Sequence, residues 1–190
     1  MECRRIIVVT GSVGAGKTTL SRELARILQC RYINLGDYLI SKGLTAGIDR
    51  RRKSIVVKEG NIMDELKKED CLIIETIYPN LLSGISPDLV IVLKCDPEEL
   101  YRRLKDRYDA EKIIENVEAD VIDTFTIESI NTFGDDKIME IDTTNTTLED
   151  EVKLVLSALN GSVKLPIFLN RGLDIYIKLN SIRRMLLGHS

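Results

Sequence analysis

Short apolar runs alternate with stretches of helical periodicity along most of the chain. β-Branched and aliphatic residues concentrate in five short runs, at residues 5–9, 31–33, 71–75, 88–93 and 137–141. Such runs, without polar alternation, are typical of strands buried on both faces. Helical spacing or a capping residue marks the segments between them, at 17–28, 37–43, 61–68, 113–125 and 148–159. The alternation predicts an α/β fold in which a five-stranded parallel sheet carries helices on both faces.

Length and composition fit one domain with a smaller addition. The 190 residues are 44% apolar, which is ordinary for a single domain with a buried core. We expect a main domain at residues 1–162 and a C-terminal extension at 163–190. No apolar run approaches the roughly 18–20 residues of a membrane span. The first run has only about four apolar residues and no cleavage site after it, so we expect a cytoplasmic protein.

The four cysteines give no sign of a metal site or a disulfide framework. Cys3, Cys30, Cys71 and Cys95 are scattered and form no C-x-x-C pair. Cys71 and Cys95 lie in or beside apolar runs, where a thiol usually acts as a small buried hydrophobe. We therefore expect free thiols rather than zinc ligands or disulfide bonds.

A phosphate-binding loop follows the first apolar run. The segment Gly11–Thr18 matches G-x-x-x-x-G-K-[ST] in full, with a predicted strand before it and a predicted helix after it. Glycines let backbone N–H groups surround phosphate oxygens, and the helix start adds its positive dipole end. The lysine reaches the β- and γ-phosphates, and the threonine hydroxyl binds Mg²⁺. The expected ATP ligands are Gly11, Gly14, Ala15, Gly16, Lys17, Thr18 and Thr19.

A second Mg²⁺ ligand is expected at the end of a neighbouring strand. Glu75 closes the third apolar run, where a carboxylate can hold Mg²⁺ together with Thr18. The alternative is a strand-end acid that faces solvent. Asp96 follows the fourth run, but the segment Asp96-Pro97-Glu98-Glu99 is better explained as the capped start of a helix.

Two arginines are candidates for stabilising charge during phosphoryl transfer. Arg103 and Arg107 are four residues apart, so they share a helix face just before a break near Tyr108. Planar guanidinium groups neutralise the charge that develops on a transferred phosphoryl group. The alternative is a solvated basic face shared with Arg102 and Lys105.

Several segments together resemble the adenylate kinase 6 family, in an archaeal version. The resemblance runs in order over roughly residues 4–160 and rests on the phosphate loop and on the segments Ile33–Asp37, Pro87–Leu93, Asp96–Leu104, Glu115–Ala119 and Ile141–Thr144. It implies a three-layer nucleoside monophosphate kinase fold with an AMP-binding insert at about 34–69 and a short lid at about 103–116. The implied reaction is ATP + AMP = 2 ADP with Mg²⁺. Family members are also described as ATPases that assist small ribosomal subunit maturation.

The resemblance also implies roles for individual residues. Asp37 would line the AMP side, Arg103 and Arg107 would belong to the lid, and Thr143 would lie in the loop near the adenine. These roles add to the ATP and Mg²⁺ roles of the phosphate loop.

The chain departs from the family pattern at two places. The family's acid-x-His motif reads Glu75-Thr76-Ile77 here, and isoleucine can neither orient water nor shuttle a proton. The ATPase role is therefore a weaker expectation than the kinase role. In the insert, Lys58 stands where an acid is expected, beside the basic run Arg50–Lys53. That run would either grip the α-phosphate of AMP or form a solvated loop.

The C-terminal extension differs in charge from the rest of the chain. It contains five basic residues and one acidic residue, which gives it a net charge of +4. Because the whole chain has a net charge of −3, the other 162 residues carry −7. One interpretation is a docking surface for a small-subunit ribosomal protein or rRNA. The other is a segment folded over the acidic body.

A kinase for another small metabolite also stays open as a function of the whole chain, because a phosphate loop does not specify the acceptor.

Overall fold

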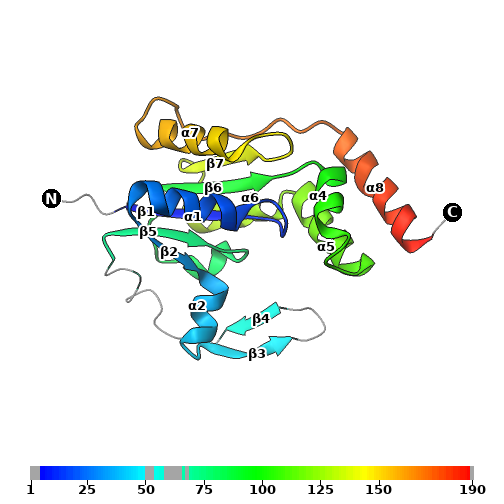
Figure 1. Ribbon diagram of the computed structural model, residues 1–190, viewed down its shortest axis with the longest axis horizontal. Helices are drawn as coiled ribbons and strands as arrows, with labels where there is room; N and C mark the ends of the chain where they lie inside the picture. The colour runs from blue at the N-terminus through cyan, green and yellow to red at the C-terminus, as the bar shows by residue number, and fades with distance from the viewer. Residues whose placement is uncertain (1–4, 50–53, 58–65, 67–68, 189–190) are drawn as a thin grey trace.

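Five parallel strands form the centre of the fold, as the sequence predicts. The computed structural model describes residues 5–49, 54–57, 66 and 69–188. The sheet has the order β2-β5-β1-β6-β7 (Figure 1). Its strands are β1 (Arg5–Gly11), β2 (Arg31–Asn34), β5 (Cys71–Glu75), β6 (Leu89–Lys94) and β7 (Ile138–Asp142). The phosphate loop follows the central strand β1, so it lies at the carboxyl edge of the sheet, where open α/β folds bind ligands.

Helices cover both faces of the sheet because the strands present apolar side chains alternately to each side. Ile7 and Val9 of β1 face a cluster formed with α1 (Lys17–Leu28) and α7 (Leu148–Leu159). Ile6 and Val8 face the opposite cluster. That cluster includes residues of α2 (Leu35–Ser41), the 3₁₀ turn η1 (Pro79–Leu82) and α6 (Thr124–Phe133).

A third apolar cluster lies beyond the carboxyl ends of the strands. It is built by α4 (Pro97–Leu104), α5 (Ala110–Val121) and α8 (Asp174–Leu187), which lie together at one end of the molecule (Figure 1). Leu100 and Leu104 of α4 are fully buried there, against Val117 of α5 and Leu179 of α8. The C-terminal helix is thus part of the packing around the range predicted as the lid. The domain, insert and lid boundaries stay predictions.

Two helix predictions differ from the structure. The helix expected to begin at Asp37 begins at Leu35, because the side chain of Asn34 accepts a hydrogen bond from the Asp37 N–H at 3.1 Å and caps it. The single helix expected to run to Phe125 is two helices, α5 and α6. Asp123 separates them with a left-handed φ of 59°, while its carboxylate accepts a hydrogen bond from the buried Lys94 ammonium at 2.6 Å.

The range predicted as the insert contains, after α2, a short hairpin that the sequence did not predict. Strands β3 (Thr45–Asp49) and β4 (Ser54–Val57) pair antiparallel. The basic run Arg50–Lys53, Lys58 and most of the helix expected at 61–68 lie outside the described residues.

A disulfide bond contradicts the expectation of free thiols. Cys30 and Cys71 are bonded across a sequence separation of 41 residues, with their Cα atoms 4.8 Å apart. Cys30 directly precedes β2 and Cys71 opens β5, and these strands are neighbours in the sheet. Spacing along the chain does not reveal such a pairing. Closing a loop of this length lowers the entropy of the unfolded chain, which adds about 4 kcal/mol to the unfolding free energy in the chain-entropy account. Cys95 is a buried free thiol, as expected.

The C-terminal extension folds over the body of the protein. Ile167 forms a parallel bridge with Met139 of β7, and three basic residues then pair with acids of the body. The pairs are Arg171 with Asp120 at 2.8 Å, Lys178 with Asp96 at 2.6 Å, and Arg183 with Glu118 at 2.5 Å. The structure thus shows the second of the two arrangements considered for this segment.

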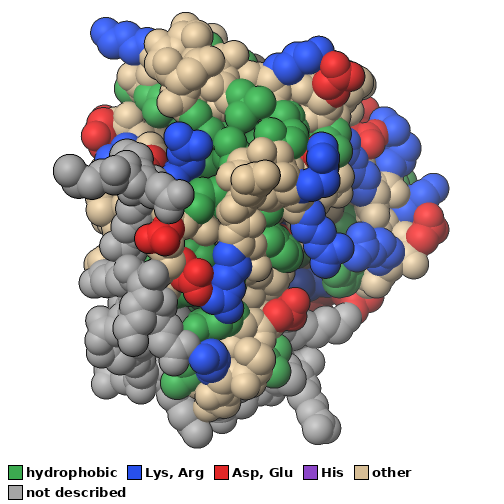
Figure 2. All heavy atoms as spheres, turned by 60° about the vertical axis from the view of Figure 1, so that its left-hand side comes forward, with side chains coloured by type: hydrophobic (Ala, Val, Ile, Leu, Met, Phe, Trp, Pro, Cys, Tyr) green, Lys and Arg blue, Asp and Glu red, His purple; other side chains and the backbone are tan. Residues whose placement is uncertain are grey.

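Charges of both signs and single apolar side chains are mixed on the surface. On the face drawn in Figure 2, Lys and Arg side chains gather on one side with a few Asp and Glu among them, and hydrophobic side chains lie between. In the described part of the chain, no helix is both long enough and apolar enough to cross a bilayer.

The Arg171–Asp120 pair generates a stability prediction. Asp120 is fully buried, and the Arg171 guanidinium also donates to the carbonyls of Asp120 and Cys95 at 3.0 and 2.9 Å. Arg171→Gln leaves a buried carboxylate without its charge partner, so we expect a loss of about 3 kcal/mol in unfolding free energy. Arg184→Gln, on the exposed side of α8, is the matched control and should cost less than about 0.5 kcal/mol. Urea unfolding measures both, and equal losses would contradict the anchoring role.

Candidate active site

Two positions of the phosphate loop require glycine, because the backbone there lies close to neighbouring parts of the chain. Gly11 has a φ of 132°, and a Cβ there would lie 2.4 Å from the carbonyl oxygen of Leu93. Gly14 has a φ of 87°, and its Cβ would lie 3.0 Å from Leu104 and 3.2 Å from Leu100. The loop therefore packs directly on β6 and on α4, and a side chain at either position would push it out of place.

Lys17 is buried at the start of α1. Its side chain is 7% exposed, and the ammonium donates a hydrogen bond to the Ser12 carbonyl at 2.8 Å. Burial lowers the pKa of Lys17 to about 8, although the negative charge of Glu75 acts in the opposite direction. A phosphate group bound beside this ammonium would supply negative charge that favours its protonated form, which the phosphate loop itself does not provide.

Thr18 and Glu75 lie together, as predicted for two Mg²⁺ ligands. The Thr18 hydroxyl donates a hydrogen bond to Glu75 Oε1 at 2.7 Å. Glu75 is 5% exposed, so it is not a solvent-facing acid at a strand end. Its second oxygen, Oε2, accepts a hydrogen bond from the hydroxyl of Tyr32. Tyr32 carries no sequence signal for the site, since only the pairing of β2 with β5 brings its side chain to Glu75.

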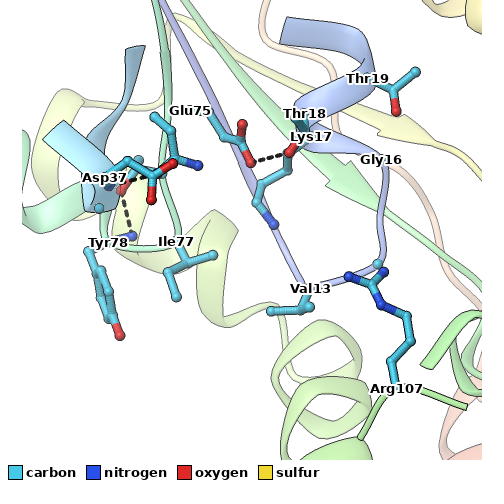
Figure 3. A pocket seen from close by; sticks show the side chains of 14 residues that line it. Val13, Gly16, Lys17, Thr18, Thr19, Asp37, Glu75, Ile77, Tyr78 and Arg107 are labelled. Atoms are coloured by element: carbon cyan, nitrogen blue, oxygen red, sulfur yellow. Dashed lines mark hydrogen bonds between the residues drawn. The ribbon is translucent and has the colours of Figure 1, made fainter. Parts of the chain in front are cut away.

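One cavity of about 600 Å³ joins the phosphate loop to the neighbouring strand ends (Figure 3). Asp37, on the first turn of α2, lies on one side of it, and Arg107 lies on the other (Figure 3). Both were predicted for the site. The lining residues are Val13, Gly14, Gly16, Lys17, Thr18, Thr19, Asn34, Gly36, Asp37, Glu75, Thr76, Ile77, Tyr78 and Arg107.

Four predicted site residues do not line this cavity. Gly11 packs against Leu93, and Ala15 is fully buried in the α1 cluster. Arg103 and Thr143 instead contact each other behind the loop.

Arg103 links three parts of the chain. Its guanidinium donates to the Gly14 carbonyl at 3.2 Å and to the Thr143 carbonyl at 2.7 Å, and its Nε donates to Glu99 at 2.9 Å. The side chain therefore ties α4 to the phosphate loop and to the loop after β7. Arg107 lies in the turn after α4 and so does not share a helix face with Arg103 as predicted; it makes none of these contacts and lines the cavity.

Archaeal proteins resemble this chain over most of its length. The "Putative adenylate kinase" of Saccharolobus solfataricus is 38% identical over 156 residues, which cover 80% of this chain and 82% of that protein. The protein of the same name from Pyrococcus furiosus is 34% identical over 160 residues, covering 84% and 86%. The chain belongs to the family of these archaeal proteins. Residues 7–123 also match a family model described as an AAA domain.

Solved structures of kinases share the fold of this chain. A shikimate kinase from Acinetobacter baumannii has a TM-score of 0.58 at 18% identity, covering 85% of this chain and 96% of its own. A deoxyadenosine kinase from M. mycoides has a TM-score of 0.53 at 17% identity, covering 82% and 99%. At such identities the likeness concerns the fold alone. It confirms the predicted P-loop kinase architecture.

The chemistry of the site fits ATP with Mg²⁺. Thr18 and Glu75 offer two oxygen ligands side by side on the cavity wall, and oxygen is the donor that Mg²⁺ prefers. Within the described residues, no group of three or more His, Cys, Asp or Glu side chains could enclose a metal ion by itself. This pattern suits Mg²⁺, which usually binds through one or two protein oxygens and the phosphates of a nucleotide.

The buried ammonium of Lys17 generates a prediction for the ligand-free protein. Because its folded pKa of about 8 lies below the ordinary 10.5, the unfolded chain binds more protons between these values. The unfolding free energy should therefore rise by up to about 3 kcal/mol as the pH increases from 8 to 10.5. Urea unfolding across this range should show the rise in wild type and in the exposed control Lys164→Met. A rise of the same size in Lys17→Met would contradict the assignment.

Proposed function

We propose that this protein transfers the γ-phosphoryl group of ATP to AMP with Mg²⁺, forming two ADP, as an archaeal-type member of the adenylate kinase 6 family. One observation carries the proposal. A single cavity has the phosphate loop on one wall and the segments around Asp37 and Tyr78 on another, and Arg107 also lines it. A donor and an acceptor nucleotide bound to these walls would place their phosphates in the same space.

The phosphate loop supplies the donor half of the reaction. Backbone N–H groups of the loop and the Lys17 ammonium bind the β- and γ-phosphates, and Thr18 with Glu75 holds the metal ion. Bound Mg²⁺ supplies positive charge that neutralises the phosphate oxygens. Because the pKa of Lys17 is about 8 before ligand binds, the arriving phosphates favour the protonated form that transfer requires.

The acceptor half needs no protein nucleophile. A phosphate oxygen of AMP attacks the γ-phosphorus in line, so the protein contributes position and charge. Asp37 and its neighbours Asn34 and Gly36 bind the acceptor side, and the exposed guanidinium of Arg107 stabilises the transferred group. Arg103 acts by holding Gly14 and the Thr143 loop in place, and Thr143 shapes the end of the site that takes the adenine.

Ile77 favours a kinase over an ATPase. Its side chain lines the cavity and packs on the core cluster around Ile74. An apolar side chain offers no hydrogen bond to a water that would attack ATP. The role in ribosome assembly has less support, because Arg171, Lys178 and Arg183 of the basic extension are already paired with acids of the same chain. A kinase for another small metabolite would share the donor wall and differ at Asp37 and Tyr78.

The reaction is tested by ADP production from Mg-ATP with and without AMP, with the nucleotides separated by chromatography. We expect ADP only when AMP is present, at two for each ATP consumed. Lys17→Met should abolish this turnover while keeping a cooperative unfolding transition, because it removes the ammonium that holds the transferred phosphate. The exposed control Lys164→Met should retain it.

Three results would contradict the proposal. Normal turnover in Lys17→Met would refute the site. ADP and free phosphate formed without AMP would point to an ATP-driven switch, and ADP formed only with another acceptor would point to a metabolite kinase.

A further inference from the structure

Glu75 is held at both carboxylate oxygens. Oε1 accepts a hydrogen bond from Thr18 at 2.7 Å, and Oε2 accepts one from the Tyr32 hydroxyl. A glutamate has more rotatable bonds than an aspartate, so one contact alone would leave its carboxylate free to turn. The second contact fixes the plane of the carboxylate.

The register of the sheet brings Tyr32 to Glu75. Tyr32 of β2 pairs with Ile73 of β5, and Glu75 is two residues further along β5. Residues two apart on a strand project from the same face, so Tyr32 and Glu75 are diagonal neighbours on the face that α1 covers. The phenol ring packs against the apolar cluster beneath α1.

Helix α1 holds the ring from the other side. The Arg22 guanidinium lies over the Tyr32 ring, 5.5 Å from its centroid. Arg22 follows Thr18 by four residues, so both project from the same side of α1. One helix face therefore contacts the ring of Tyr32 through Arg22 and the carboxylate of Glu75 through Thr18.

The hydroxyl of Tyr32 is the donor in this contact, and it reaches the oxygen of Glu75 that is turned away from Thr18.

From this geometry we propose that Tyr32 is a positioning residue, which fixes Glu75 so that Oε1 is presented, beside Thr18, to the metal ion of a bound nucleotide. The proposal rests on the function proposed above. Because the side chain of Glu75 has one more rotatable bond than an aspartate, it needs a second contact to fix its carboxylate, and Tyr32 supplies that contact. Tyr32 itself contacts neither the nucleotide nor the metal ion, and its effect passes through Glu75.

The test compares ADP binding in excess Mg²⁺ with ADP binding in excess EDTA, by calorimetry on the full chain. Tyr32→Phe keeps the ring and removes the hydroxyl. We expect its Mg²⁺-free affinity for ADP to stay within about twofold of wild type, while the gain in affinity that Mg²⁺ provides falls about tenfold. Tyr176→Phe, on the exposed face of α8, is the matched control and should keep the full gain.

A double-mutant cycle separates action through Glu75 from a general structural effect. In a Glu75→Gln background, Tyr32→Phe should change neither affinity further. A full Mg²⁺ gain in Tyr32→Phe, or an undiminished effect of Tyr32→Phe in the Glu75→Gln background, would overturn this inference alone. A wild-type protein whose ADP affinity does not respond to Mg²⁺ would overturn both the inference and the proposed function.

Discussion

Two opposite charges are buried at the carboxyl edge of the central strands, and the rest of the site is arranged around them. Lys17 and Glu75 are 7% and 5% exposed. Burying an ammonium group is costly, and in the ligand-free protein one carbonyl contact and the charge of Glu75 offset that cost only in part. The phosphates of a nucleotide would complete the balance. The perturbed pKa of Lys17 thus belongs to the cavity that is proposed to bind nucleotide, and strongly perturbed pKa values cluster at functional sites.

The phosphate loop is also coupled to the helices beyond the sheet. Gly14 touches Leu100 and Leu104 of α4, and its carbonyl accepts from Arg103. The hydroxyl of Ser12 donates to the Asn116 carbonyl of α5 at 2.8 Å. Because α8 packs on α4 and α5, the C-terminal extension supports the same helices that contact the loop. Movement of these helices on nucleotide binding would therefore reach the C-terminal helix directly.

Local motifs were readable from the sequence, and features that depend on strand order were not. The phosphate loop and the five strands follow from residue types at fixed spacing, and the neighbourhood of Thr18 and Glu75 follows from the general behaviour of parallel sheets. The disulfide Cys30–Cys71 and the contact of Tyr32 with Glu75 both require β2 to lie beside β5. Nothing in the spacing of these residues specifies that adjacency.

The predicted boundaries of the helix that runs to Phe125 were wrong for a related reason. The break at Asp123 coincides with a hydrogen bond to Lys94, which is distant in sequence and buried at the end of β6. Arg103 and Arg107 were predicted to share a helix face, but α4 ends at Leu104 and Arg107 lies in the turn after it. Of the two, Arg107 lines the cavity. Arg103 turns instead toward Thr143, a partner 40 residues away.

The central claim is that one cavity holds a donor and an acceptor nucleotide together. It is tested most directly by calorimetric titration with two adenosines joined through five phosphates, in the presence of Mg²⁺. The account predicts one such molecule per chain, bound at least about 100-fold more tightly than ATP because both halves bind at once, and able to displace both ATP and AMP. An affinity no higher than that of ATP, or binding of AMP to the protein already saturated with this molecule, would contradict it.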